Sequence, residues 1–170
     1  MMKVGVVVSF LLPESIVDED YLTDRSESVR TSYEDLLVEI SKKFGGYTIT
    51  PGLSGGWVDD DGDLLVDSNI RLDVSVVSQE GKLRWLYTEI VKFARSIDEQ
   101  ALYIGIGGKS YILDLDERFT GDMDQFVRAV YFESLHDAIH AEQAHSADLP
   151  YQITDSSWFR NIPQRRITNE

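Results

Sequence analysis

The sequence predicts an α+β fold, and two stretches of the chain lead to that prediction. Residues 83–97 carry apolar side chains at helical spacing, and two short strand patterns, residues 101–106 and 111–114, follow around a Gly107-Gly108 turn. Residues 3–12 form a valine-rich apolar run, which is typical of a buried central strand. We expect the core to form around residues 83–114, where helical and strand periodicities follow one another most clearly.

The remaining elements complete the order of the fold. A helix is expected to begin near Ser26 or Ser28 and to end at Phe44, before two glycines. Residues 47–50 predict a short strand, an Asp-Gly pair near residue 61 predicts a hairpin turn, and residues 70–76 alternate as a strand with one buried face. The resulting order, strand-helix-strand-strand-helix-strand, is that of a ferredoxin-like βαββαβ antiparallel sheet with two helices on one face.

Two elements and a tail extend this unit. The strand at residues 111–114 and a helix over residues 122–145 are expected as a C-terminal strand and helix added to the ferredoxin-like sheet. We expect residues 1–148 to form a single α+β domain. Residues 149–170 contain Tyr151, Trp158 and Phe159, and this aromatic content predicts a C-terminal tail docked on the domain.

The turn and packing residues resemble those of a known group of proteins. Phe44-Gly-Gly-Tyr-Thr, Gly56-Trp57 before the Asp-Gly turn, and Gln100-Ala-Leu-Tyr-Ile resemble a pattern of small uncharacterised bacterial and phage proteins with ferredoxin-like folds. The resemblance covers about residues 3–106 and implies the fold. It transfers no active site, because one fold hosts many functions.

Charge and composition restrict the classes of function. The net charge is −14, and residues 13–39, 59–73 and 111–148 are strongly acidic, so direct binding to nucleic acid or to an anionic membrane is not expected. The chain contains no cysteine, which excludes disulfides and thiolate metal sites and fits a cytoplasmic protein. An acidic surface instead suits a basic protein partner, although it also serves solubility alone.

All three histidines lie in the predicted third helix. Glu133, His136 and His140 share one side of a helix, and imidazole with carboxylate at this spacing can bind a divalent metal. The His136-to-His140 segment is similar to the H-E-x-x-H zinc pattern, with Asp137 in place of the glutamate. No third ligand follows in a recognisable motif, and a solvated histidine pair is the simpler interpretation.

Aromatic and acidic residues elsewhere supply two further candidate contacts. A small-molecule pocket between the sheet and residues 14–27 would be lined by Tyr21, Tyr33 and Trp57. The acidic run before the hairpin turn is a candidate contact for a basic partner and is formed by Asp59, Asp60 and Asp61. Trp57 is expected to be either a core or an interface residue.

No catalytic motif is complete, so the leading hypothesis is a non-enzymatic, acidic binding or regulatory module. It would self-associate through a sheet face or a strand edge and, in its sharpest form, would be a phage-type inhibitor of a nucleic-acid-handling protein. The first alternative is a small metal-dependent hydrolase or metal-binding protein that uses Glu133, His136 and His140. The second is a small-molecule-binding domain, and neither the leading hypothesis nor this one requires a cofactor.

Overall fold

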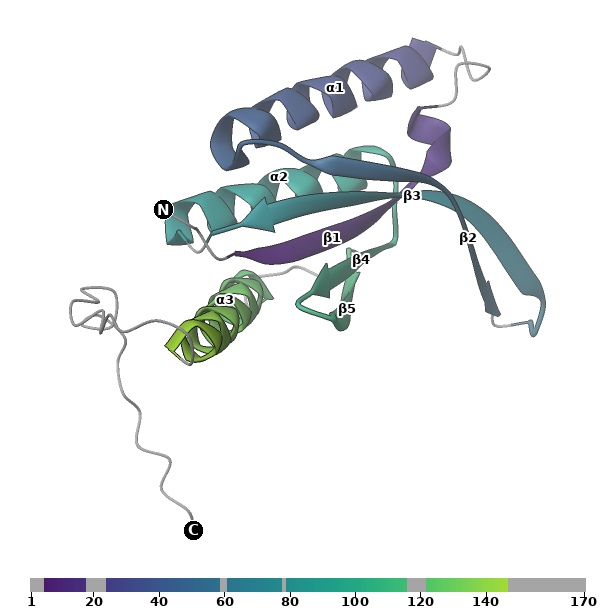
Figure 1. The fold of residues 1–170 in the computed structure, drawn as a ribbon. Helices are drawn as coiled ribbons and strands as arrows, with labels where there is room; N and C mark the ends of the chain where they lie inside the picture. Colours follow the sequence, from purple (N-terminus) through teal and green to yellow (C-terminus); the bar gives the residue numbers. More distant parts are fainter. Residues whose placement is uncertain (1–4, 18–23, 59–60, 78, 116–121, 147–170) are drawn as a thin grey trace.

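A computed structural model describes residues 5–17, 24–58, 61–77, 79–115 and 122–146 (Figure 1). Five strands and three α-helices follow one another along this part of the chain. They are β1 (Val6–Pro13), α1 (Asp24–Phe44), β2 (Thr48–Val58), β3 (Leu64–Val76), α2 (Glu80–Ser96), β4 (Ala101–Ile106), β5 (Lys109–Asp114) and α3 (Asp122–Ser146), with a 3-10 turn at Glu14–Ile16 after β1.

The strand order confirms the predicted fold. The sheet runs β2-β3-β1-β4-β5, and every neighbouring pair is antiparallel. The first four strands with α1 and α2 therefore form the ferredoxin-like βαββαβ unit. β5 extends the sheet beside β4, and α3 is the added C-terminal helix, both as the sequence predicts.

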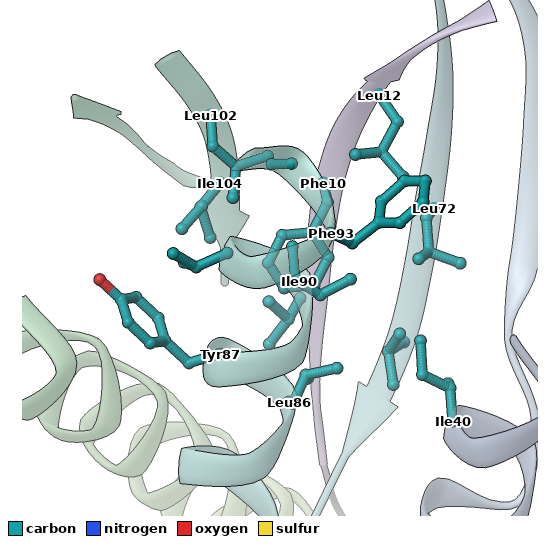
Figure 2. Close-up of a cluster of buried hydrophobic side chains, with 14 of the residues drawn as sticks. Phe10, Leu12, Ile40, Leu72, Leu86, Tyr87, Ile90, Phe93, Leu102 and Ile104 are labelled. Atoms are coloured by element: carbon teal, nitrogen blue, oxygen red, sulfur yellow. The ribbon is translucent and has the colours of Figure 1, made fainter. Parts of the chain in front are cut away.

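One face of the sheet is covered by the helices, and the core lies there. Successive side chains of a strand point to opposite faces, so every second residue of β1 and of the later half of β3 is buried. Figure 2 shows Phe10 and Leu72 from the sheet meeting Leu86, Ile90 and Phe93 from α2. The fully buried side chains of the two central strands are Val8, Phe10, Leu12, Ile70, Leu72, Val74 and Val76.

The helices reach this face through apolar stripes at helical spacing. α1 buries Tyr33, Leu36, Leu37 and Ile40, which lie three or four residues apart. α3 joins the same core, since Phe126 of α3 and Tyr87 of α2 have ring centroids 5.0 Å apart. All three helices therefore cover one side of the sheet.

Three element boundaries predicted from the sequence differ from those in the structure. α1 begins at Asp24, before the serines that were expected to cap it. The acidic connection between β1 and α1 is therefore shorter than the sequence predicts. β2 and β3 are also longer than expected, since β2 reaches Val58 and β3 begins at Leu64. The reason is that residues 53–58 and 64–69 pair with each other outside the core, where burial does not impose the alternation used to predict strands.

Residues 149–170 lie outside the described residues, so the docking of the aromatic tail and the domain boundary at residue 148 remain predictions. Within the described part of the chain, no helix is long and apolar enough to cross a membrane.

Candidate functional site

A two-stranded arm carries the largest group of exposed apolar side chains in the described part of the chain. We define the arm as residues 53–58 of β2 and 64–69 of β3, which pair with each other from Leu53 opposite Asn69 to Val58 opposite Leu64. It starts after a register shift between Thr50 and Leu53, where Gly52 has a φ of 71°. Such a bulge increases strand twist and bends the sheet. In Figure 1 the paired strands run beyond the helices and curve away from the body.

Both faces of the arm carry apolar side chains. Residues directly opposite in an antiparallel pair point to the same face, so Trp57 and Leu65 share one face while Val58 and Leu64 share the other with Val66. The exposed fractions are 54% for Trp57, 62% for Val58, 67% for Leu64, 41% for Leu65 and 66% for Val66. A two-stranded hairpin with both faces in water is only marginally stable by itself. The arm therefore has the composition of a surface that a partner covers.

The arm is also nearly free of charge, in a chain that is 27% charged. Among its twelve residues only Asp67 is charged. β2 is an edge strand of the sheet, and none of its eleven residues is charged. Natural edge strands are usually protected from pairing by charged side chains, and interface cores are depleted of charge. The uncharged edge of β2 is thus open to pairing with another chain, with Pro51 and the bulge as its only local interruptions.

An acidic pair marks the base of the arm. Burial, and then the negative charge of Asp67, raise the pKa of the half-buried Glu99, which precedes β4. The Asp67 carboxylate packs directly against Gly55. A Cβ at residue 55 would lie 2.8 Å from a carboxylate oxygen of Asp67, which is too close, so a larger residue would displace the Asp67 side chain. The protonation of Glu99, which lies in the body, is therefore affected by the charge of Asp67, which lies on the arm.

The uncovered face of the sheet carries a polar network at its centre. Ser9 of β1 donates a hydrogen bond of 2.6 Å to Asp73 of β3, and Arg71 Nε donates one of 3.1 Å to the other oxygen of Asp73. Gly105 of β4 pairs with Ser9, and the ring of Tyr103 extends over it, since a Cβ on Gly105 would lie 3.7 Å from the Tyr103 hydroxyl. Apolar side chains flank this network, with Val7 51% and Ile112 79% exposed.

The residues predicted for a small-molecule pocket lie in different surroundings. Tyr33 is 3% exposed in the core and contacts Phe93, with ring centroids 5.8 Å apart. Trp57 is exposed on the arm, so the interface alternative for this residue remains and the core alternative is wrong. Tyr21 lies outside the described residues, as do Asp59 and Asp60, whereas Asp61 is exposed in the turn of the hairpin.

Burial also changes the pKa of the Tyr33 hydroxyl. Desolvation, and then the nearby Tyr47, raise the pKa of Tyr33 to about 12. Its hydroxyl has no hydrogen-bond partner among the described residues. Tyr33 therefore acts as a core aromatic residue. A shallow hollow on the outer side of α1, lined by Glu27, Ser28, Thr31 and Ser32, is too open to enclose a ligand.

The structure separates Glu133 from the two histidines with which it was predicted to act. The Glu133 side chain is only 12% exposed, and its carboxylate accepts a hydrogen bond from Lys109 Nζ and lies against Gly107 in the β4–β5 turn. His136 and His140 instead face each other, with their Nε2 atoms 3.0 Å apart. In the described ranges no three His, Asp or Glu side chains converge on a metal position. The three-ligand site remains a prediction that would require Glu133 to leave Lys109.

Sequence reasoning identified the hairpin turn but missed the length and exposure of the arm. The available signal was the run Leu64-Leu65-Val66, where adjacent apolar residues break the alternation of residues 70–76. Consecutive apolar residues on a strand put apolar side chains on both faces of the sheet. A two-layer fold buries only one of these faces, so the side chains on the other face stay exposed.

Comparisons with known proteins find only distant structural similarities. No family model matches the chain, and no curated protein matches it. Among solved structures, a phage SAM lyase in complex with S-methyl-5′-thioadenosine gives a TM-score of 0.45 at 11% identity, covering 67% of this chain and 92% of its own. The same type of lyase in its apo state gives 0.43 at 12% identity, covering 70% and 99%. The divalent ion tolerance protein CutA1 from Ehrlichia chaffeensis gives 0.38 at 11% identity, covering 79% and 98%. These similarities are too distant to transfer an activity, a ligand or a residue role, and the ferredoxin-like assignment rests on the strand order itself.

Proposed function

We propose that the protein is a non-enzymatic binding module that works as a homo-oligomer, with a second copy of the chain covering the arm. The observation that carries the proposal is the arm, whose apolar side chains face water on both sides. Complete burial of a Val or Leu side chain stabilises by about 1.5–3 kcal/mol relative to exposure. The arm exposes two such valines, two such leucines and Trp57, at exposed fractions of 41–67%. Covering them supplies several kcal/mol, which a second identical arm can provide symmetrically.

A second copy fits this surface better than a charged partner does. The arm strands carry one charge, so two arms meet with little local repulsion, and the uncharged β2 edge offers unpaired backbone groups for strand pairing. The rest of the chain, at a net charge of −14, repels its own copy. Salt screens that repulsion over about 10 Å at 0.1 M, so self-association should strengthen as salt is added.

The test is the mass of the protein in solution, measured by analytical ultracentrifugation over a roughly hundredfold concentration range at low and at high salt. Val66→Asp on the arm is compared with Phe132→Asp on α3, because both side chains are 66% exposed and both variants add the same charge. The proposal expects wild type and Phe132→Asp to form the same discrete oligomer and Val66→Asp to be monomeric. A monomeric wild type at every concentration and salt, or an unchanged oligomer in Val66→Asp, would overturn it.

Residues 59–63 join the two strands of the arm, and this segment, which we call the tip, is the part of the module that we propose for a basic protein partner. Four aspartates lie within the five residues that join the two strands, at positions 59, 60, 61 and 63. Two of them, Asp61 and Asp63, belong to the described residues and are exposed. Like charges concentrated at the end of a projecting element attract cationic surfaces and raise the rate of encounter.

This contact has a matched control. Asp61→Asn with Asp63→Asn, and Glu34→Gln with Asp35→Asn on α1, each remove two negative charges. With polylysine as the basic probe, the tip variant should lose more affinity than the α1 variant, and added salt should weaken binding, opposite to its effect on self-association. Equal losses would show that only net charge matters and would remove the tip from the proposal.

A small-molecule-binding domain remains the second candidate, favoured by the network of Ser9, Arg71 and Asp73 beside Tyr103 on the uncovered sheet face. A few fixed polar groups beside an aromatic ring are the usual elements of a ligand site. S-methyl-5′-thioadenosine, the compound in one of the compared structures, is a convenient first probe in a thermal-shift titration. A saturable shift that Asp73→Asn abolishes would support this candidate, and no shift would show that the network does not bind this compound.

A further inference from the structure

The histidine pair on α3 has a geometry that differs from the three-ligand site predicted from the sequence. His136 and His140 lie four residues apart, so their side chains project from the same side of the helix one turn apart. Their Nε2 atoms are 3.0 Å from each other, and their rings meet edge to face with centroids 4.2 Å apart. Two ring nitrogens this close are within hydrogen-bond distance, and they are also close enough to bind one metal ion.

We propose that His136 and His140 form a bidentate chelate for a divalent transition metal of the Cu²⁺ or Ni²⁺ class. With metal–nitrogen bonds of about 2.05 Å, nitrogens 3.0 Å apart subtend an angle of about 94° at the ion. That is close to the right angle between neighbouring ligands in square-planar or tetragonal Cu²⁺ and Ni²⁺ sites. A tetrahedral Zn²⁺ site, at about 109°, requires the nitrogens to separate to about 3.35 Å.

The neighbouring residues favour the required tautomer and leave room for the ion. Asp137 lies 3.8 Å from Nδ1 of His136, on the far side of the ring from Nε2. That distance is too long for a hydrogen bond, but a negative charge on that side of the ring favours the tautomer with the proton on Nδ1, which leaves the Nε2 lone pair for a metal. The His136 side chain is 65% exposed, so water can fill the remaining coordination positions. Imidazole nitrogen is a preferred ligand of both ions, and the acidic chain attracts cations.

Glu133 is not part of the proposed chelate. Its carboxylate is held by Lys109 and is mostly buried beside the β4–β5 turn. This pairing distinguishes the chelate from a Glu-His-His hydrolytic site, because the chelate supplies two protein ligands and a catalytic zinc site has three. The proposal is independent of self-association through the arm, which lies on other elements.

The test is a Cu²⁺ titration of the untagged full chain, followed by isothermal calorimetry and by electron paramagnetic resonance. Wild type should bind one equivalent with the spectral signature of two nitrogen ligands, more tightly than it binds Zn²⁺. His136→Gln and His140→Gln should each weaken binding by about 100-fold, because the one remaining histidine binds the metal without the gain that comes from a second ligand held close by. Glu133→Gln and His145→Gln, which remove a neighbouring carboxylate and the remaining histidine, should bind as wild type does.

Three results would overturn the proposal. Stoichiometric binding that survives the double His136→Gln/His140→Gln change would place the metal elsewhere. A loss in Glu133→Gln as large as in the histidine variants would restore the three-ligand site. No binding by wild type beyond that of the double variant would show that the two rings share only a proton.

Discussion

The two halves of β3 contain similar residues in opposite surroundings. From Ile70 to Val76 the strand alternates, and each apolar side chain is 0% exposed beneath the helices. From Leu64 to Val66 the same strand carries three successive apolar residues that are 41–67% exposed. One half thus encodes a single buried face, whereas the other encodes two faces that nothing in the described part of the chain covers.

This difference separates residues that make the fold from residues available for an interaction. A two-layer domain needs one apolar face of its sheet, and β3 supplies it with residues 70–76. The apolar residues of the arm add nothing to that layer, and exposed apolar patches of this kind are typical of interaction sites. Leu72 and Leu64 allow a direct comparison of a core residue with an arm residue, because both are leucines of β3.

The largest effect is expected from truncating these two leucines. Leu72→Ala should lower the free energy of unfolding by about 2–5 kcal/mol, because it removes buried methyl groups and leaves a cavity. Leu64→Ala should change it by about 0.5 kcal/mol or less at protein concentrations where the chain is monomeric. Urea denaturation measures both.

The same pair of variants sharpens the comparison at high concentration. If a second copy covers the arm, Leu64→Ala should become destabilising as concentration rises, while the loss in Leu72→Ala should stay constant. A large, concentration-independent loss in Leu64→Ala would mean that the arm belongs to the folding core of a single chain.

Removing the arm should abolish self-association while preserving the body. Ser54 and Ser68 pair directly, so residues 55–67 can be replaced by Asn-Gly, a sequence suited to a two-residue hairpin turn. The shortened protein should keep its circular dichroism spectrum and remain monomeric in analytical ultracentrifugation. An oligomer of the shortened protein would move the interface to the uncovered sheet face around Val7 and Ile112. Val66→Asp provides the same test if the shortened chain does not fold.

A smaller effect is expected in the covered layer at Tyr33. Tyr33→Phe removes a hydroxyl that has no hydrogen-bond partner among the described residues, so stability at pH 7 should be unchanged or higher by about 1 kcal/mol. The pKa of Tyr33 is about 12 in the folded chain, above the ordinary tyrosine value of 10.0. The unfolded chain therefore loses this proton first, and wild type should lose stability from Tyr33 as pH rises from 10 towards 12.

Chemical denaturation of both proteins across that pH range isolates the contribution of Tyr33, because the other tyrosines titrate in both. The difference in stability between Tyr33→Phe and wild type should widen in favour of the variant above pH 10. A constant difference would show that the Tyr33 hydroxyl reaches solvent.

Periodicity predicted the body of the protein because burial enforces it. Val8, Phe10, Leu72 and Val74 are apolar at every second position since the sheet has one covered face, and Leu83, Leu86 and Ile90 repeat at helical spacing for the same reason. The arm escaped prediction because Leu64, Leu65 and Val66 follow no one-sided pattern. Helical spacing also predicted that Glu133 would act with His136 and His140. Spacing along one helix cannot reveal that Lys109, which is distant in sequence, forms an ion pair with Glu133.

The smallest effect is expected where the body meets the arm, at Glu99. Burial and then Asp67 raise the pKa of Glu99, so the folded chain binds this proton more tightly than the unfolded chain does. The ionised group opposes folding at pH 7, and that opposition fades as pH falls below the folded pKa and is gone below the unfolded value. Glu99→Gln should therefore raise stability at neutral pH, by about 0.5 kcal/mol or less because the site is half exposed. Asp67→Asn should recover only part of this gain, since burial is the larger cause. Thermal melts at pH 7 and pH 4 test both, and an advantage for Glu99→Gln that is the same at both pH values would show that the Glu99 carboxylate is not perturbed by the arm.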